Sequence, residues 1–92
     1  MHVLVAKMTF HLEGMGSLKD KRRLRQAVIE RLRQRFGVSV AEVAHADSTD
    51  LLTIGMAIVG SQRVTLQATM QRGISFASGV LGDASDMCVE FR

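Results

Sequence analysis

The sequence of 92 residues has no proline, tyrosine or tryptophan, and its only cysteine is Cys88. A single cysteine excludes an intrachain disulfide framework and any zinc or iron–sulfur site built from several cysteines. No apolar run approaches the roughly 18–20 residues that a membrane span requires. Residues 1–12 contain Lys7 and His11 and lack a basic start, so they do not resemble a signal peptide. These absences predict a cytoplasmic protein without membrane contact, and nothing in the sequence calls for a cofactor or a metal.

The residues that are present are typical of a folded domain. The chain is 47% hydrophobic and 23% charged, which argues against disorder. Its length allows one domain, which we place over residues 1–92. A core of this size is modest, so we expect marginal stability or support from a second copy of the chain.

Positive charge is concentrated in residues 19–35. This segment has eight basic and two acidic residues and a net charge of +6, whereas the rest of the chain carries −3. Such asymmetry points to a polyanion or to an acidic protein as partner. A solvated helix whose basic residues only provide solubility explains the charge equally well, and the sequence leaves both interpretations open.

Alternation of apolar and polar residues predicts four strands. They cover residues 2–13, 38–43, 51–59 and 87–91. In the first strand the even-numbered residues form the core side. A polar turn over residues 45–50 joins the second strand to the third.

Two helices are predicted between these strands. The first begins after Ser17, a good N-cap, and ends before Gly37, which suits the position after a helix C-terminus. Ser61 is expected to cap the second helix, which runs to about Ser78 and is followed by a turn between Gly79 and Gly82. Its expected inner stripe consists of Val64, Leu66, Ala68, Met70 and Ile74.

The resulting order, β-α-β-β-α-β, predicts an α+β fold of the ferredoxin-like type. In this fold two helices cover one face of a four-stranded antiparallel sheet, and the other face has no helix over it. The apolar residues expected on that open face are Val3, Val5, Ala41, Val43, Ala57 and Val59. Since an uncovered apolar face usually belongs to an interface, we expect a homo-oligomer formed through this face or through an edge strand.

The first helix carries the main functional signal. Lys19, Arg22, Arg23 and Arg33 lie within an arc of about 100° on the side away from the apolar residues, and we expect them to contact RNA phosphates. Lys21 and Arg25 instead fall inside the apolar arc. They either snorkel past the edge of the sheet or face inward, toward a bound anion or a buried carboxylate.

Other functions of this fold find less support. An RNA-recognition motif needs aromatic residues on the open face, and residues 51–59 contain none. A metal chaperone needs a pair of cysteines. The loop Gly14–Lys19 precedes a helix and allows an acylphosphatase-like enzyme that holds phosphate there, but short glycine motifs often arise by chance. No spacing brings a serine or Cys88 together with a histidine, so catalysis has no positive support.

Two segments resemble the YlxP-like family of small bacterial proteins of unknown function. They are Ser17-Leu18-Lys19-Asp20-Lys21-Arg22-Arg23 and Arg33-Gln34-Arg35-Phe36-Gly37-Val38-Ser39-Val40-Ala41-Glu42-Val43. The resemblance implies a ferredoxin-like fold and, because members are frequently encoded beside translation genes, a link to RNA or ribosome maturation. It brings no catalytic residues. Relatives tend to have Asp-Leu-Trp where this chain has Asp50-Leu51-Leu52, so a role of that tryptophan does not transfer.

Charge and resemblance together favour a non-enzymatic module that associates with structured RNA or the ribosome through its basic first helix. The alternatives are a structural domain that interacts with proteins or with copies of itself and, with less support, an acylphosphatase-like enzyme.

Overall fold

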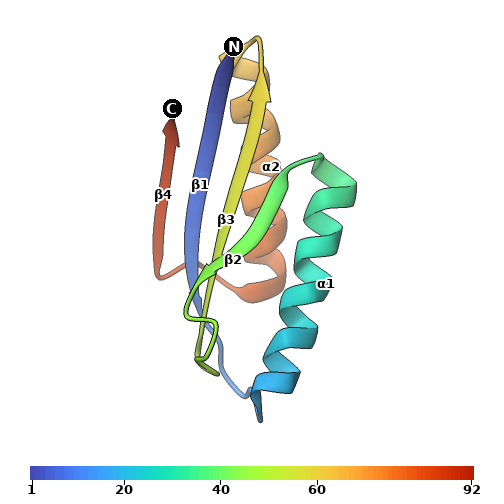
Figure 1. The fold of residues 1–92 in the computed structure, drawn as a ribbon, viewed down its shortest axis with the longest axis vertical. Coiled ribbons are helices and arrows are strands. Elements are labelled where there is room, and N and C mark those ends of the chain that lie inside the picture. Colours follow the sequence, from blue (N-terminus) through green and yellow to red (C-terminus); the bar gives the residue numbers. More distant parts are fainter.

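The computed structural model describes all residues from Met1 to Arg92 and confirms the predicted order of strands and helices. Figure 1 shows the six elements. They are β1 (His2–His11), α1 (Leu18–Phe36), β2 (Ser39–Ala44), β3 (Leu51–Gly60), α2 (Arg63–Leu81) and β4 (Asp86–Phe91).

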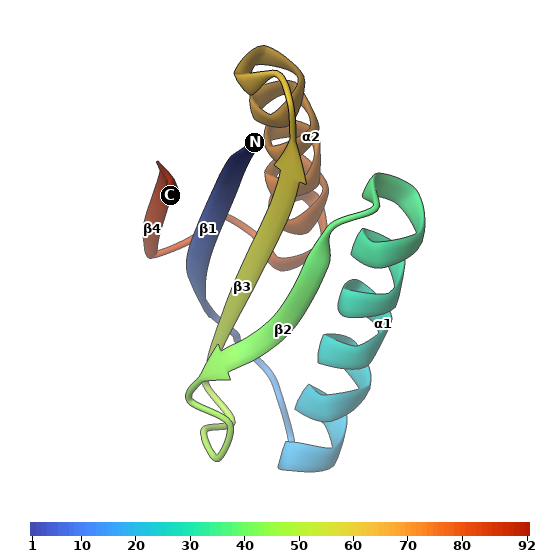
Figure 2. The ribbon, with the colours of Figure 1, turned by 45° about the horizontal axis from the view of Figure 1, so that its top comes forward.

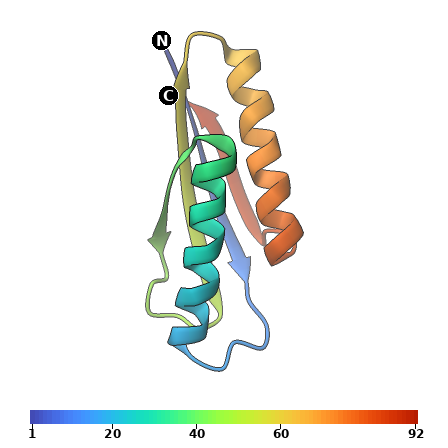
Figure 3. The same ribbon diagram turned by 90° about the vertical axis from the view of Figure 1, so that its right-hand side faces the viewer.

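The four strands form one antiparallel sheet in the order β2-β3-β1-β4. Both helices lie on the same side of this sheet, as Figure 3 shows, and the opposite face is open. The two chain ends lie near each other at one end of the sheet (Figure 1), where the Arg92 amide donates to the Val3 carbonyl at 2.8 Å. The ferredoxin-like fold predicted from the sequence is therefore confirmed.

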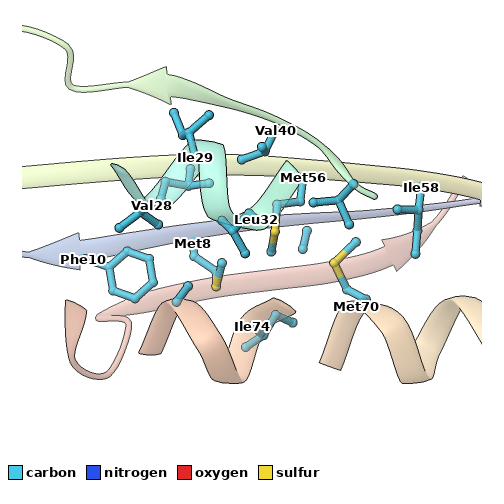
Figure 4. Close-up of a cluster of buried hydrophobic side chains, with 14 of the residues drawn as sticks. Met8, Phe10, Val28, Ile29, Leu32, Val40, Met56, Ile58, Met70 and Ile74 are labelled. Atoms are coloured by element: carbon cyan, nitrogen blue, oxygen red, sulfur yellow. The ribbon is translucent and has the colours of Figure 1, made fainter. Parts of the chain in front are cut away.

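The core lies between the sheet and the two helices (Figure 4). The even-numbered residues of β1 from Leu4 to Phe10 are buried, as the alternation predicts. From α1 the core receives Val28, Ile29 and Leu32. This packing turns the remaining side of α1 toward solvent.

The predicted ends of α1 are confirmed. The Ser17 hydroxyl accepts a hydrogen bond from the Asp20 amide at 3.2 Å, which satisfies one of the free amides of the first turn. At the other end Gly37 adopts a left-handed conformation with φ of 65°, and its amide donates to the Arg33 carbonyl at 3.0 Å.

The sequence-based bounds of α2 are wrong at both ends. The helix begins at Arg63, so the N-cap position belongs to Gln62 and not to Ser61, and Gln62 forms no side-chain cap. It continues through Gly79 and ends only at Leu81, and the following residue, Gly82, has a φ of 85°. The expected turn between these two glycines is therefore absent, because one of them belongs to the helix.

The inner stripe of α2 also differs from the expected one. Val64 is 77% exposed and Ala68 is exposed, although both were expected in the core. The buried residues are Leu66, Met70, Gly73, Ile74 and Ala77. They follow helical spacing, whereas the expected set mixed it with alternation along the chain.

The strands differ from their expected ranges by one or two residues. The first strand ends at His11 instead of Glu13, the second covers Ser39–Ala44, and the fourth begins at Asp86. Figure 2 shows β2 bending at the edge of the sheet beside α1. Its pairing with β3 shifts between Glu42 and Ala44, which is a β-bulge.

Candidate functional site

The solvent side of α1 carries six exposed cations, which we call the α1 basic surface. Its members are Lys19, Arg22, Arg23, Arg31, Arg33 and Arg35. The protein has three ion pairs, and none of them involves a residue of this surface. Acidic neighbours on the helix are limited to Asp20 and Glu30, and Glu30 accepts a hydrogen bond from Gln26 at 2.9 Å. The surface thus presents positive charge that the chain itself does not neutralise.

The four cations predicted to contact phosphate are all exposed but are not equivalent. Lys19, Arg22 and Arg23 form no side-chain hydrogen bond and no ion pair, so their side chains are free to meet a ligand. Arg33 donates from Nη2 to the Val40 carbonyl at 3.1 Å and is therefore anchored to the edge strand β2. This bond leaves other guanidinium N–H groups of Arg33 available.

Lys21 and Arg25 face inward, and the anion that they meet is a carboxylate of the chain itself. Lys21 is 1% exposed, and its Nζ lies 3.2 Å from Glu42 Oε2 and donates to the His45 carbonyl at 2.6 Å. Arg25 donates from Nη1 to Glu42 Oε1 at 2.9 Å. Snorkelling, one of the two interpretations of Lys21, is therefore wrong. Both cations contact the same carboxylate, and these contacts connect α1 to β2.

A series of polar contacts continues from Lys21, Arg25 and Glu42 into the sheet. His45 has a φ of 62°, a left-handed conformation that is uncommon outside glycine. Its Nδ1 lies 2.8 Å from the hydroxyl of buried Thr53, which in turn lies 2.9 Å from the hydroxyl of Thr9. A histidine beside a hydroxyl can activate that hydroxyl as a nucleophile. Thr53, however, is 0% exposed, so no substrate can reach its hydroxyl.

The acidic partner, Glu42, was missed in the sequence although a signal for it exists. Two cations on the apolar arc of a helix require an anion when they are buried. Glu42 lies two residues after Val40, a core residue of the same strand. Its side chain therefore points to the same face of the sheet, toward α1. A search of the predicted strands for an acidic residue on the core-facing side would have identified the ion cluster of Lys21, Arg25 and Glu42.

The loop before α1 is a poor site for phosphate. Ser17 already serves as the helix cap, and its hydroxyl accepts from the Asp20 amide. The Asp20 carboxylate lies against Gly16, with Oδ2 3.2 Å from the position that a Cβ would take there. A phosphate in this loop would therefore meet a negative charge, which disfavours the acylphosphatase-like alternative.

The open face of the sheet has a shallow apolar hollow of about 330 Å³. Its lining includes Val5, Ala41, Val43 and Ala57. Val43 leans over Gly55, where a Cβ would lie only 2.9 Å from Val43 Cγ1, so glycine provides the space for this valine. Val43 and Val59 on this face are 53% and 64% exposed.

Comparison with known proteins adds the family and the fold. Residues 3–82 match the profile of a family described as protein of unknown function, DUF503. Over 61 residues the chain is 34% identical to the uncharacterized protein YlxP of Bacillus subtilis (strain 168). This match spans 66% of the chain and 66% of the relative, slightly under two thirds of that relative's length.

Similar solved structures share little sequence with the chain. The de novo designed protein Foldit4 has a TM-score of 0.56 at 13% identity, over 99% of this chain and 94% of its own. The protein At3g17210 from Arabidopsis thaliana has a TM-score of 0.56 at 13% identity, over 98% and 92%. At such low identity the likeness shows the fold alone.

Neither α1 nor α2 combines the length and apolar character that crossing a membrane demands.

Proposed function

The chain belongs to the DUF503 family of proteins of unknown function, and we propose that it is a non-enzymatic module that binds structured RNA through the α1 basic surface. The observation that supports this proposal is that the cations on α1 fall into a paired and an unpaired group. Two of them, Lys21 and Arg25, share the Glu42 carboxylate as ion-pair partner, while six others are exposed without a carboxylate partner. Exposed unpaired cations along one helix match the regular negative charge of a nucleic-acid backbone.

The residue types favour phosphate over other anions. Five of the six exposed cations are arginines, whose planar guanidinium groups bind phosphate oxygens in a bidentate manner. The 19 residues of α1 give a rod about 28 Å long, enough to follow several phosphates of an RNA helix. The two phenylalanines of the sheet, Phe10 and Phe91, lie on its helix-covered side, Phe91 opposite the core residue Leu4. The open face therefore has no phenylalanine to stack bases, and recognition by backbone shape is the expected mode there.

Replacing Arg22 and Arg23 together by alanine tests this proposal. With about four phosphate contacts, the plot of log affinity against log salt should have a slope of roughly −3 to −4 for the unmodified protein. The double variant should flatten this slope by nearly two and weaken binding to all RNA sequences alike. Fluorescence anisotropy with a labelled ribosomal RNA fragment, between about 50 and about 200 mM salt, measures both quantities.

The matched control removes two positive charges elsewhere. Arg63 and Arg92 lie near Phe91 and Glu90 at the β4 edge and not on α1, so their double alanine variant should leave most of the slope unchanged. Equal flattening by the two variants would contradict a specific role of α1. An acidic protein as partner predicts a different result, since its capture on the immobilised protein would survive nuclease treatment.

We also propose that two copies of the chain associate through the open face of the sheet. The apolar hollow around Ala57 lies on this face, and the flanking strand β4 adds Asp86 and Glu90 while β1 adds Lys7. Charges of both signs on one face permit a two-fold arrangement in which unlike charges meet across the interface. A chain of this size also gains stability from the additional buried area.

An Ala57→Asp substitution should convert the dimer into monomers, because it places a charge without a partner in the centre of the interface. Sedimentation equilibrium of the unmodified and substituted proteins measures this change. Val64→Asp is the matched control, since Val64 lies on α2, away from the open face, and is already exposed. A monomeric unmodified protein would rule out the proposed association.

A further inference from the structure

A groove between the two helices is the largest hollow on the helical side of the molecule that combines aromatic and basic side chains. It has a volume of about 550 Å³ and lies between the last turn of α1 and the middle of α2. We call it the α1–α2 groove. Its lining consists of Arg35, Phe36, Ala68, Gln71, Arg72, Ser75 and Phe76.

The groove contains an aromatic pair that is only partly used by the core. Phe36 and Phe76 are half-buried, and their ring centres lie 5.9 Å apart with an angle of 55° between the planes. The guanidinium carbon of Arg35 lies 5.1 Å from the centre of the Phe76 ring and 5.7 Å from that of Phe36. Two tilted rings and a guanidinium group in cation–π contact with both thus gather at the surface.

The polar groups of the groove select for a negatively charged ligand. Arg35 and Arg72 take part in no ion pair, and no acidic residue lines the groove. Gln71 and Ser75 lie beside them, with Gln71 Nε2 and Ser75 Oγ 3.4 Å apart, a weak bond that a ligand can replace. These side chains supply donors for an anion and both donors and acceptors for a polar ring edge.

We propose that the α1–α2 groove binds one unpaired nucleotide of an RNA, a proposal that rests on the RNA-binding function inferred above. The base stacks on the Phe36, Phe76 and Arg35 group, and Arg72 contacts the adjoining phosphate. Unstacked bases are recognised in this way on aromatic rings and guanidinium planes. An acidic peptide would use the two arginines but leave the aromatic pair without a role.

The position of the groove connects it to the α1 basic surface. Arg35 belongs to both, because it stands one turn beyond Arg31 on α1 and its guanidinium reaches the rings in the groove. An RNA whose backbone follows α1 can therefore place a nucleotide at the end of its paired region into the groove. The occupant is then a loop or a single-stranded end next to a helix, rather than a uniform duplex.

A Phe76→Trp substitution provides a direct probe of this contact. The chain has no tryptophan or tyrosine, so the new indole is the only strong fluorophore of the protein. A hairpin RNA with unpaired purines in its loop should quench the indole by stacking, whereas the blunt duplex of the same stem should bind without quenching. Phe91→Trp is the matched control, because Phe91 is also half-buried but lies on β4, away from the groove, and its signal should not change.

Two further variants separate this proposal from the RNA-binding function itself. Phe76→Leu keeps an apolar side chain against the core but removes the ring, and it should weaken hairpin binding roughly five- to one-hundred-fold while leaving duplex binding unchanged. Arg72→Gln in the Phe76→Trp background should reduce quenching, and Arg63→Gln, an equal charge change on the same helix, should not.

The outcomes distinguish the two proposals. RNA binding in the anisotropy assay without quenching at position 76 would overturn the groove and retain the α1 basic surface. Absence of any RNA binding would overturn both. Equal quenching by adenosine monophosphate and by the hairpin, at the same concentration, would identify a free nucleotide as the ligand and overturn the RNA assignment.

Discussion

The Glu42→Gln substitution should lower the free energy of unfolding by about 3 kcal/mol, because it removes one partner of a buried ion cluster. Lys21, at 1% exposed, would keep its bond to the His45 carbonyl but lose its only counter-charge. Arg25 would lose its carboxylate partner as well. Glutamine has nearly the same shape as glutamate, so the loss reports charge and not a cavity.

Thermal unfolding followed by circular dichroism measures this effect, since the chain lacks the residues needed for intrinsic fluorescence. We expect a decrease in Tm of roughly 12–24 °C at equal protein concentration. Glu90→Gln is the control, because Glu90 pairs with Arg92 at 2.6 Å on the surface, where both side chains are at least half exposed. Its effect should stay within about 1 kcal/mol. Similar losses for both variants would contradict the importance of burial.

The Leu32→Ala substitution should cost about 3 kcal/mol, within the range typical of buried leucines. Leu32 is 0% exposed and lies where α1 crosses α2. Its Cδ2 lies 3.8 Å from the position that a Cβ would take at Gly73, so the leucine fills the space that the glycine leaves. Chemical denaturation followed by circular dichroism gives the free energy of unfolding for the variant and for the unmodified protein.

Val64→Ala is the matched control for Leu32→Ala and also tests the corrected inner stripe of α2. The sequence pattern predicts Val64 in the core, but its side chain is 77% exposed. Removal of exposed methyl groups should change stability by less than about 0.5 kcal/mol. A loss of stability comparable to that of Leu32→Ala would show that Val64 belongs to the inner stripe of α2.

These two stability predictions also bear on function. The ion cluster holds α1 against β2, and Leu32 holds α1 against α2, so together they set the position of the α1 basic surface and of the α1–α2 groove. A variant that loosens either contact should weaken the stacking of a nucleotide in the groove more than salt-dependent binding along α1. Phosphate contacts tolerate small displacements, whereas a stacked ring requires a fixed partner.

Local patterns in the sequence determined the element order and the first helix. Alternation in residues 2–13 separated the two faces of β1, and Ser17 and Gly37 marked the ends of α1, because caps and periodicity act within a few residues. The charge asymmetry of residues 19–35 was equally visible, and with it the helix face that we propose as the RNA-binding surface.

Tertiary structure alone decided which cations of α1 remain unpaired at the surface and which form ion pairs inside the protein. Helical periodicity sets Lys21 and Arg25 apart on the apolar arc but leaves open which anion they meet. Only the approach of β2, a segment distant along the chain, brings Glu42 to them. The α1–α2 groove arises in the same way, since Phe36 and Phe76 meet only where the helices cross. Contacts between distant segments depend on packing, which no local pattern encodes, and so the division between the buried ion cluster and the open basic surface belongs to the fold.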